Sequence, residues 1–436
     1  MTSLSPLPLP TYEKSAENRL YAKVTWRLIP FLCLCYFCAY LDRVNVGFAK
    51  LQMLDDLQWS ETVYGLGAGI FFVGYILVEV PSNILLQRVG AKRWIARIMI
   101  TWSLLSAATA FVTTPAMFYV IRFLLGVAEA GFLPGIILYL TYWYPADRRA
   151  KITAFFYCAI PLSGVIGGPL SGWIMSAFTG VSGLQGWQWL FLLEAAPSLL
   201  VGIAVLFILD DGIRHARWLT PMEKSILERN IQSESDDKLH HSIAQAFKDS
   251  RVWLMGLIFF TCAMGIYTFS FWLPSLIKDA GVKDVLNVGL LVAVPYAFGM
   301  VSMVLWARHS DQTRERRWHL AIAMAVGAVG LALSTLTGYG IYFVLPALTL
   351  ASVGIQAMAP IFWSMPTAFL GGAAAAAGIA LITAIANIGG LTSTYLVGWI
   401  KDLTGSAEIG LYAVAAVLVA GSVITLAAVP ARLVNK

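Results

Sequence analysis

Charge is scarce in this sequence. Only 12% of its 436 residues are Asp, Glu, Lys or Arg and 58% are hydrophobic, whereas soluble domains carry about 25% charged residues. The five Cys all lie in apolar runs and have neither zinc-site nor disulfide spacing. No phosphate-binding loop, HExxH or GxSxG motif occurs. These absences argue against a soluble enzyme, a resident cofactor or metal, and ATP-driven transport within this chain. We interpret His240 and His241 as solvated loop residues.

What the sequence has instead is a series of apolar runs of about 20 residues, the length that crosses a bilayer as a helix. They predict an all-α polytopic membrane protein with twelve transmembrane helices. The runs lie at about residues 27–48, 61–80, 94–112, 116–140, 152–177, 188–209, 252–277, 286–307, 318–336, 340–364, 374–400 and 409–430. The first run is too long for a cleavable signal peptide, and we expect residues 1–22 to be a disordered tail.

Lys and Arg are distributed unequally among the loops. If the N-terminus is inside, the cytoplasmic segments hold 24 of the 30 Lys and Arg residues, and the outside segments hold four. This bias predicts that both termini are cytoplasmic. It also accounts for the net charge of +6 without a nucleic-acid partner.

The only sizeable polar stretch lies between the sixth and seventh runs and suggests two halves of six helices. Similar short segments recur 224 residues apart, at Lys92-Arg93-Trp94 and Arg316-Arg317-Trp318, as expected for related halves. Glycines spaced by four, such as Gly65 and Gly69 or Gly164 and Gly168, predict close helix packing. The predicted parts are a tail at 1–22, a bundle at 23–209, a connector at 210–251, a bundle at 252–430 and a tail at 431–436.

Six ionisable side chains fall inside the predicted helices, and all are in the first half. They are Asp42, Arg43, Glu79, Arg122, Glu129 and Glu194. Each such charge costs about 2.5–3.5 kcal/mol on insertion scales, so it is retained where it faces water, a partner or a substrate. The asymmetry predicts that the first half holds the charge chemistry and the second half supplies apolar and neutral polar walls.

Depth along the helices relates four of these residues. Asp42 lies 15 residues beyond Arg27, or about 22 Å at 1.5 Å per residue, and Arg122 lies about 9 Å below the outer edge. Asp42, Arg43 and Arg122 therefore share the outer third of the bilayer. Glu129 is two turns below Arg122 on nearly the same face, close to the midplane. We expect one cavity lined by two cations and two acids if the first and fourth helices adjoin.

Such a cavity suits an anion, because guanidinium groups bind carboxylates through two hydrogen bonds. Desolvation near the midplane would favour protonation of Glu129. Asp42, beside the arginines, would stay ionised until a substrate anion competes for those partners. The alternative is an ion-pair network that only fixes helix packing, and the roles of Glu79 and Glu194 are left open. Further candidate substrate contacts are Tyr40, Tyr75, Gln356, Trp363 and Asn387.

Several stretches resemble the major facilitator superfamily, and within it the anion:cation symporter family, over about residues 20–430. They are Tyr40-Leu-Asp42-Arg43-Val-Asn45, Pro81-Ser-Asn-Ile-Leu-Leu-Gln87-Arg88-Val-Gly90-Ala-Lys92-Arg93-Trp94, Arg122-Phe-Leu-Leu-Gly126-Val-Ala-Glu129-Ala-Gly131-Phe-Leu-Pro134-Gly135, Tyr142-Trp-Tyr-Pro145, Arg148-Arg149-Ala-Lys151, Gly167-Gly-Pro169-Leu-Ser-Gly172-Trp173 and Ser310-Asp311 with Arg316-Arg317-Trp318. The resemblance implies two gating loops, with Arg88, Gly90 and Lys92 in one and Asp311 and Arg316 in the other. Gln87 stands where the first loop usually has an acid.

The resemblance also implies proton-coupled import of an organic anion, such as tartrate, phthalate, a sugar acid or an aromatic acid, by alternating access. Arg43 and Arg122 would bind the substrate, while Asp42 and Glu129 would bind protons. We expect a monomer in the bacterial inner membrane. An anion exchanger or a drug efflux antiporter is the alternative, since Gly167-Gly-Pro169 is similar to an antiporter motif. A membrane enzyme or a sensor is disfavoured, because neither a catalytic cluster nor a signalling domain is visible.

Overall fold

The computed structural model describes residues 14–145, 148, 152, 156–235, 248–369 and 372–435. Every regular element in these ranges is helical, which confirms the all-α prediction. The first part of the chain forms α1 (Lys14–Leu57), α2 (Glu61–Val89), α3 (Ala91–Ala108), η1 (Thr109–Phe111), α4 (Pro115–Glu129), α5 (Phe132–Thr141), α7 (Ala159–Ala177), η2 (Val181–Gly183), α8 (Gly186–Ile208), η3 (Ile213–His215) and α9 (Pro221–Ser235). The second part forms α11 (Ser250–Asp279), α12 (Val285–Thr313), α13 (Arg317–Ser334), η4 (Thr337–Tyr339), α14 (Ile341–Ser364), η5 (Pro366–Ala368), α15 (Gly372–Thr404), α16 (Glu408–Ala428) and α17 (Ala431–Val434).

Eleven helical segments of the described ranges are long and apolar enough to cross a membrane, and α4 and α5 together form one of them. The chain is therefore a multi-pass membrane protein. The predicted run at 152–177 corresponds to α7, which packs against α1, α8 and α12. Its 19 residues include four glycines and two prolines, and it is not among the eleven. Eleven of the twelve predicted spans are thus confirmed, and the twelfth stays a prediction.

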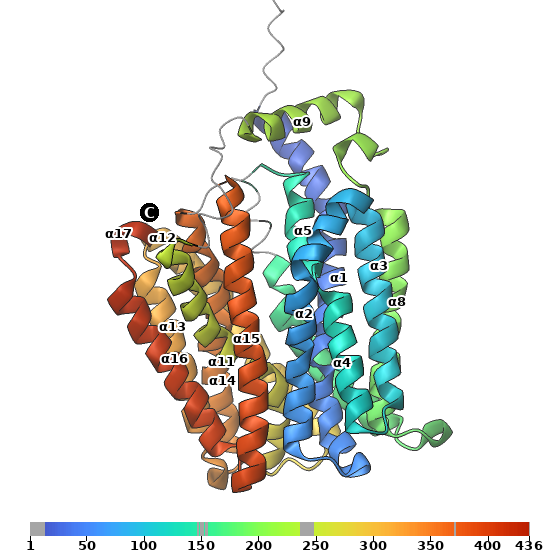
Figure 1. Ribbon diagram of the computed structural model, residues 1–436, viewed down its shortest axis with the longest axis vertical. Coiled ribbons are helices and arrows are strands. Elements are labelled where there is room, and N and C mark those ends of the chain that lie inside the picture. The colour runs from blue at the N-terminus through green and yellow to red at the C-terminus, as the bar shows by residue number, and fades with distance from the viewer. Residues whose placement is uncertain are drawn as a thin grey trace, which may run out of the picture.

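The helices form two groups that lie side by side (Figure 1). In one group α3 packs against α8 and α2 packs against α4, while in the other α13 packs against α14 and α16. Three pairs of helices connect the groups: α2 with α15, α7 with α12, and α1 with α11. The groups come from the first and second parts of the chain. The boundaries that we predicted for the two bundles stay predictions.

Glycines allow the two groups to approach closely. A Cβ atom on Gly65 of α2 would lie 2.5 Å from the carbonyl oxygen of Thr394 in α15. A Cβ atom on Gly168 of α7 would lie 2.7 Å from the carbonyl oxygen of Gly289 in α12. No side chain fits at these distances, so the close packing predicted from the glycine spacing is confirmed.

The first helix begins within the expected N-terminal tail, so the prediction of disorder is wrong for residues 14–22. Two contacts explain the extra turns. Tyr21 is buried and stacks on Tyr144, with the ring centroids 6.1 Å apart. Lys23 forms a 2.8 Å ion pair with Glu223 of α9. The helix is therefore stabilised by packing beyond the apolar run, which local composition did not reveal.

The predicted run at 116–140 is not one continuous helix. It is divided into α4, which ends at Glu129, and α5. Gly131 lies between them with a φ of +85°, a left-handed conformation that glycine adopts at little cost. The break makes Glu129 the last residue of α4.

One end of the bundle carries α9 and α17, and α1 begins there (Figure 1); we call it the α9 end. The described part of the predicted connector contributes η3 and α9 to this end. Several residues discussed above lie outside the described ranges, namely 1–13, Arg149, Lys151, 236–247 with His240 and His241, and Lys436.

Candidate functional site

A buried ion pair joins α1 to α4. The Arg43 guanidinium contacts the Glu129 carboxylate, and the two residues are only 8% and 3% exposed. Taking two charges out of water costs several kcal/mol per ion, which their mutual attraction repays only with good geometry and further hydrogen bonds. Such a pair is therefore poised to exchange one partner for another group of the same charge.

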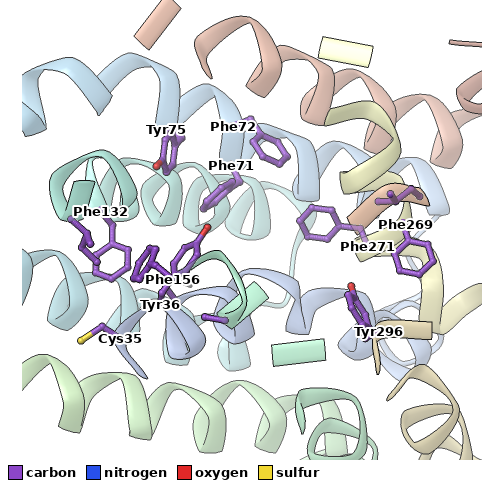
Figure 2. Close-up of a cluster of buried hydrophobic side chains, with 14 of the residues drawn as sticks. Cys35, Tyr36, Phe71, Phe72, Tyr75, Phe132, Phe156, Phe269, Phe271 and Tyr296 are labelled. Atoms are coloured by element: carbon purple, nitrogen blue, oxygen red, sulfur yellow. The ribbon is translucent and has the colours of Figure 1, made fainter. Parts of the chain in front are cut away.

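Aromatic rings surround the Arg43 guanidinium. Its central carbon lies 5.3 Å from the ring centroid of Phe71, 5.6 Å from that of Tyr75 and 5.9 Å from that of Tyr40. Figure 2 shows Phe71 and Tyr75 close together on α2. Ring faces attract a cation at these distances, and an apolar surrounding strengthens electrostatic interactions. The predicted contacts Tyr40 and Tyr75 thus lie beside the predicted substrate-binding arginine.

Arg122 of α4 lies on the same aromatic ring. Its central carbon is 5.4 Å from the Phe71 centroid, and its Nε donates a 3.3 Å hydrogen bond to the carbonyl oxygen of Gly67. Arg122 is 1% exposed, and its Nη2 has no hydrogen-bond partner among the described residues. A buried guanidinium nitrogen without an acceptor is costly, so this atom is suited to an anionic ligand. We call Arg43, Glu129, Arg122, Phe71 and Tyr75 the arginine cluster.

Asp42 is not part of the arginine cluster, although it adjoins Arg43 in sequence. Its carboxylate accepts hydrogen bonds from the Nε1 of Trp102 at 3.1 Å, the Oγ of Ser106 at 3.2 Å and the Oγ of Ser198. It forms no ion pair with either arginine among the described residues. Consecutive residues of an α-helix point about 100° apart. Asp42 therefore faces α3 and α8, and the expected pairing with the arginines is not found.

The donors around Asp42 were missed by sequence reasoning. Trp102 and Ser106 are four residues apart on α3, and both are buried, so they form a polar stripe on one helix face. That spacing is a signal that could have been found. Nothing in the sequence, however, assigns this stripe to Asp42.

Of the remaining acids in the membrane, Glu79 is buried near the α9 end of α2, where the positive charge of Arg43 acts on it. Glu194 is buried in α8 and accepts a 2.6 Å hydrogen bond from the Oγ of Ser171. Neither carboxylate has an ion-pair partner within the described part of the chain. Sequence reasoning left both roles open.

The predicted contacts from the second half are Gln356, Trp363 and Asn387. Trp363 packs on Phe259, with ring centroids 4.9 Å apart. Gln356 and Asn387 are largely buried, and the side-chain nitrogen of Asn387 has no hydrogen-bond partner in the described ranges. None of these three predicted residues forms a hydrogen bond or ion pair with an arginine there. Their assignment as substrate contacts stays a prediction.

Two residues of α11 do reach the arginine cluster, and the sequence did not single them out. The Tyr267 ring lies 4.4 Å from that of Phe72, and its hydroxyl interacts electrostatically with Arg43. The Oγ of Ser270 lies 3.2 Å from the hydroxyl of Tyr40. The second half thus brings neutral polar groups of α11 to this region.

The two predicted gating loops lie at the α9 end of the bundle. In the first, Gly90 separates α2 from α3 with a φ of +98°, and Arg88 is exposed in the last turn of α2. The backbone N–H of Lys92 donates a 2.9 Å hydrogen bond to the Oδ1 of Asp211. Asp211, which follows α8, thus supplies a carboxylate to the loop in which Gln87 replaces the usual acid.

The second loop carries its own acid. Asp311 forms a 2.6 Å ion pair with Arg316, and Arg316 also donates a 3.0 Å hydrogen bond to the Oγ of Ser310. The backbone N–H of Arg316 donates to the Oδ1 of Asn435 at 2.9 Å. The end of the chain is therefore tied to this loop. The gating roles of both loops stay predictions.

Ion pairs connect the two groups at the end of the bundle opposite α9. Glu61 of α2 pairs with Lys50 of α1 at 2.6 Å and with Lys401 of α15 at 3.1 Å. Lys401 also pairs with Asp279 of α11 at 2.9 Å. Asp402 accepts hydrogen bonds from the first backbone N–H groups of α2. We call Lys50, Glu61, Asp279, Lys401 and Asp402 the far-end network, and it joins four helices of both groups.

Comparison with known proteins identifies the family. The family model described as Major Facilitator Superfamily matches residues 32–394. The chain belongs to the major facilitator superfamily. Among curated members it is 52% identical over 412 residues to a protein of Agrobacterium vitis named "Putative tartrate transporter", with 94% of each chain covered. It is 51% identical over 421 residues to the "Putative metabolite transport protein NicT" of Pseudomonas putida, with 96% of each chain covered.

Another superfamily member, the "Quinolone resistance transporter" of Acinetobacter baumannii, is 39% identical over 412 residues, with 94% of each chain covered. Among solved structures, a D-xylose-proton symporter is similar over 93% of this chain and 98% of its own length. The TM-score is 0.74 at 16% identity, a likeness that concerns the fold. This superfamily member is thus a multi-pass membrane transporter of small organic solutes, and it is not an enzyme.

Proposed function

We propose that this transporter imports an organic carboxylate together with protons. The observation that supports this most directly is the buried ion pair of Arg43 with Glu129, which lies beside the unpartnered Nη2 of Arg122. A substrate carboxylate has the same chemistry as the Glu129 side chain. It can therefore replace Glu129 as the partner of Arg43 while its second oxygen or second acid group binds Arg122.

Displacement of Glu129 from Arg43 supplies the coupling to protons. A buried carboxylate without a cation is poorly stable as an anion, so the released Glu129 takes up a proton. The substrate carboxylate then brings one negative charge, and the proton removes the negative charge of Glu129. The net charge of the site is therefore the same with and without substrate. When Glu129 loses its proton it competes again for Arg43, which favours release of the substrate.

Asp42 is the second group that we assign to proton coupling. Its three hydrogen bonds stabilise the ionised carboxylate, and each would weaken on protonation. Two of these donors lie on α3 and one on α8. A change in the charge of Asp42 would therefore alter how α1, which also carries Arg43, packs against both helices.

Transport requires the site to open to each face of the membrane in turn. The far-end network is suited to closing one face, because it links α1 and α2 to α11 and α15. The excess of Lys and Arg in the expected inside loops favours a cytoplasmic α9 end. In this proposal the far-end network closes the outer face, and the two loops at the α9 end act as gates. We propose that the protein works as a monomer in the inner membrane.

Uptake by the purified protein in proteoliposomes tests the proposal. The panel should contain tartrate, a sugar acid, an aromatic acid and a quinolone, each measured with and without an inward proton gradient. We expect a carboxylate to accumulate only with the gradient. Gradient-independent exchange of internal for external carboxylate would identify an exchanger instead. Proton-driven quinolone movement without carboxylate uptake would identify an efflux antiporter; the Acinetobacter relative is named a quinolone resistance transporter.

A further inference from the structure

Glu194 of α8 is a buried acid that the proposed function leaves unused. It is 1% exposed, and its Oε1 accepts a 2.6 Å hydrogen bond from the Oγ of Ser171. Its Oε2 has no hydrogen-bond partner, and no Lys, Arg or His forms an ion pair with it within the described part of the chain. An ionised carboxylate in this position would be uncompensated, which costs several kcal/mol.

The groups that face Glu194 offer no positive charge. From α1 come Asp42, whose negative charge acts on Glu194, and Cys38, which lies next to Asp42 and Ser198. From α7 comes the Ser171 hydroxyl. The helix α3 also packs on α8, and there its Trp102 and Ser106 are neutral donors that bind Asp42. Since like charges oppose each other, an ionised Asp42 further disfavours an ionised Glu194.

Asn45 provides an independent observation at the same place. It lies one turn after Asp42 on α1, is 1% exposed, and its amide acts on the Glu194 carboxyl. Neither its Oδ1 nor its Nδ2 has a well-aligned hydrogen-bond partner at short distance among the described residues. A proton on the Oε2 of Glu194 would turn this orphaned oxygen into a donor toward the Oδ1 of Asn45. An ionised Oε2 could instead accept from the Nδ2 of Asn45. The pair can therefore form a hydrogen bond with the proton bound or released, as a site that exchanges a proton requires.

A small cavity at the boundary between the helix groups reaches Asn45 and Ser171, the two residues that interact with Glu194, but Glu194 itself does not line it. The volume of the cavity is about 10 Å³, and Asn45 and Ser171 line it together with Ser270 of α11 and Tyr296 of α12. That volume is about the smallest that holds one water molecule. Because its walls come from both groups, the cavity must change when the groups move relative to each other. Water reaching Asn45 from there would give Glu194 a route for proton exchange.

We propose that Glu194, with Asn45 and Ser171, is an additional proton-binding site, and that it exchanges its proton through the cavity between the two helix groups. This inference rests on the proposed proton coupling and deepens it. Each transport cycle then moves one proton bound to Glu194 on α8, in addition to the protons bound to Glu129 and Asp42. Ser198 connects the sites, because it lies one turn from Glu194 and donates to Asp42.

The number of protons moved with each substrate tests the inference. It is obtained from the membrane potential at which net tartrate flux reverses in proteoliposomes containing the full-length protein. We expect Glu194→Gln, which keeps the side-chain size, to move one proton fewer than the wild type. Glu408→Gln, at an exposed acid of α16, serves as the control and should not change the ratio. An unchanged ratio in Glu194→Gln would overturn the inference. The inference would also fail if wild-type uptake depended on a sodium gradient instead of a proton gradient and Glu194→Gln abolished that dependence.

A second measurement does not depend on the substrate. The infrared spectrum of the purified wild type should contain the carbonyl stretch of one protonated carboxylic acid that is absent from the spectrum of Glu194→Gln. The difference between the two spectra isolates this band. Ser171→Ala should shift this band, since it removes the donor to Glu194. Absence of the band at every pH at which the protein stays folded would contradict the inference. If wild-type uptake ignores the proton gradient but the band is present, the proposed symport fails while the proton site on Glu194 stands.

Discussion

Replacing Glu129 with Gln removes the anion that occupies Arg43 while preserving the size of the side chain. In the wild type a substrate must displace Glu129, and a hydrogen bond between charged groups contributes about 1.5–3 kcal/mol. Without this competitor, the substrate carboxylate meets an Arg43 that has no anionic partner. At 1.4 kcal/mol per tenfold change in affinity, we expect binding to become about 10- to 100-fold tighter.

Calorimetric titration of the purified variant with the carboxylate that is transported fastest gives this affinity near neutral pH. Proteoliposomes should show in parallel that Glu129→Gln exchanges internal for external substrate but no longer accumulates it in response to a proton gradient. Glu408→Gln is again the matched control. Unchanged or weaker binding, together with normal accumulation, would refute the exchange of Glu129 for substrate on Arg43.

Three further outcomes follow from contacts outside the arginine cluster. Lys401→Met removes two ion pairs of the far-end network, and each pair contributes about 0.2–1 kcal/mol. The population of molecules that are open at the end opposite α9 should therefore increase a few-fold. Distances between spin labels at the facing ends of α2 and α15 measure this population. Asp211→Ala removes the acceptor for the Lys92 N–H; the apparent Tm should fall, whereas Asp211→Asn should retain much of the stability. Burial disfavours ionised Glu315, but the N–H of Trp318 and other donors outweigh this and lower the pKa of Glu315. Its contribution to stability is present above the unfolded-state pKa and is lost as the pH falls through the lower folded-state value. Glu315→Gln should therefore reduce Tm at neutral pH and change it little in acid.

The fold was largely predictable because a bilayer permits few solutions. Backbone groups in lipid must be hydrogen-bonded within their own helix, so long apolar runs translate directly into spans. The exceptions have local causes. The helix α7 is rich in glycine and contains two prolines. Gly131 interrupts the apolar run at 116–140, whose composition gives no sign of the break.

The candidate site was predictable in part. Depth arithmetic brought Arg43, Arg122 and Glu129 to a common region, and the structure places both guanidiniums on the Phe71 ring. The rotation of each side chain about the helix axis determines which neighbouring helix it faces, and depth does not give this rotation. Depth alone did not distinguish Asp42 from its neighbour, although the two side chains point to different helices.

Contacts between distant segments were beyond the reach of sequence reasoning. Asp211 lies 119 residues from its partner Lys92, and Asp402 lies 340 residues from Thr62, to whose backbone N–H it bonds. No periodicity joins residues so far apart. The position of Asn45 next to Glu194 was hidden for the same reason, since it depends on how α1 packs against α7 and α8.

Proton movement on addition of substrate tests the central claim most directly. Proteoliposomes are prepared without any gradient, with a pH-sensitive dye inside, and a carboxylate from the panel is added outside. We predict that the interior acidifies as the carboxylate enters with the wild type. Vesicles with Glu129→Gln, preloaded with the same carboxylate, should exchange it without this acidification. Net carboxylate entry into wild-type vesicles with no change of internal pH would contradict proton-coupled import.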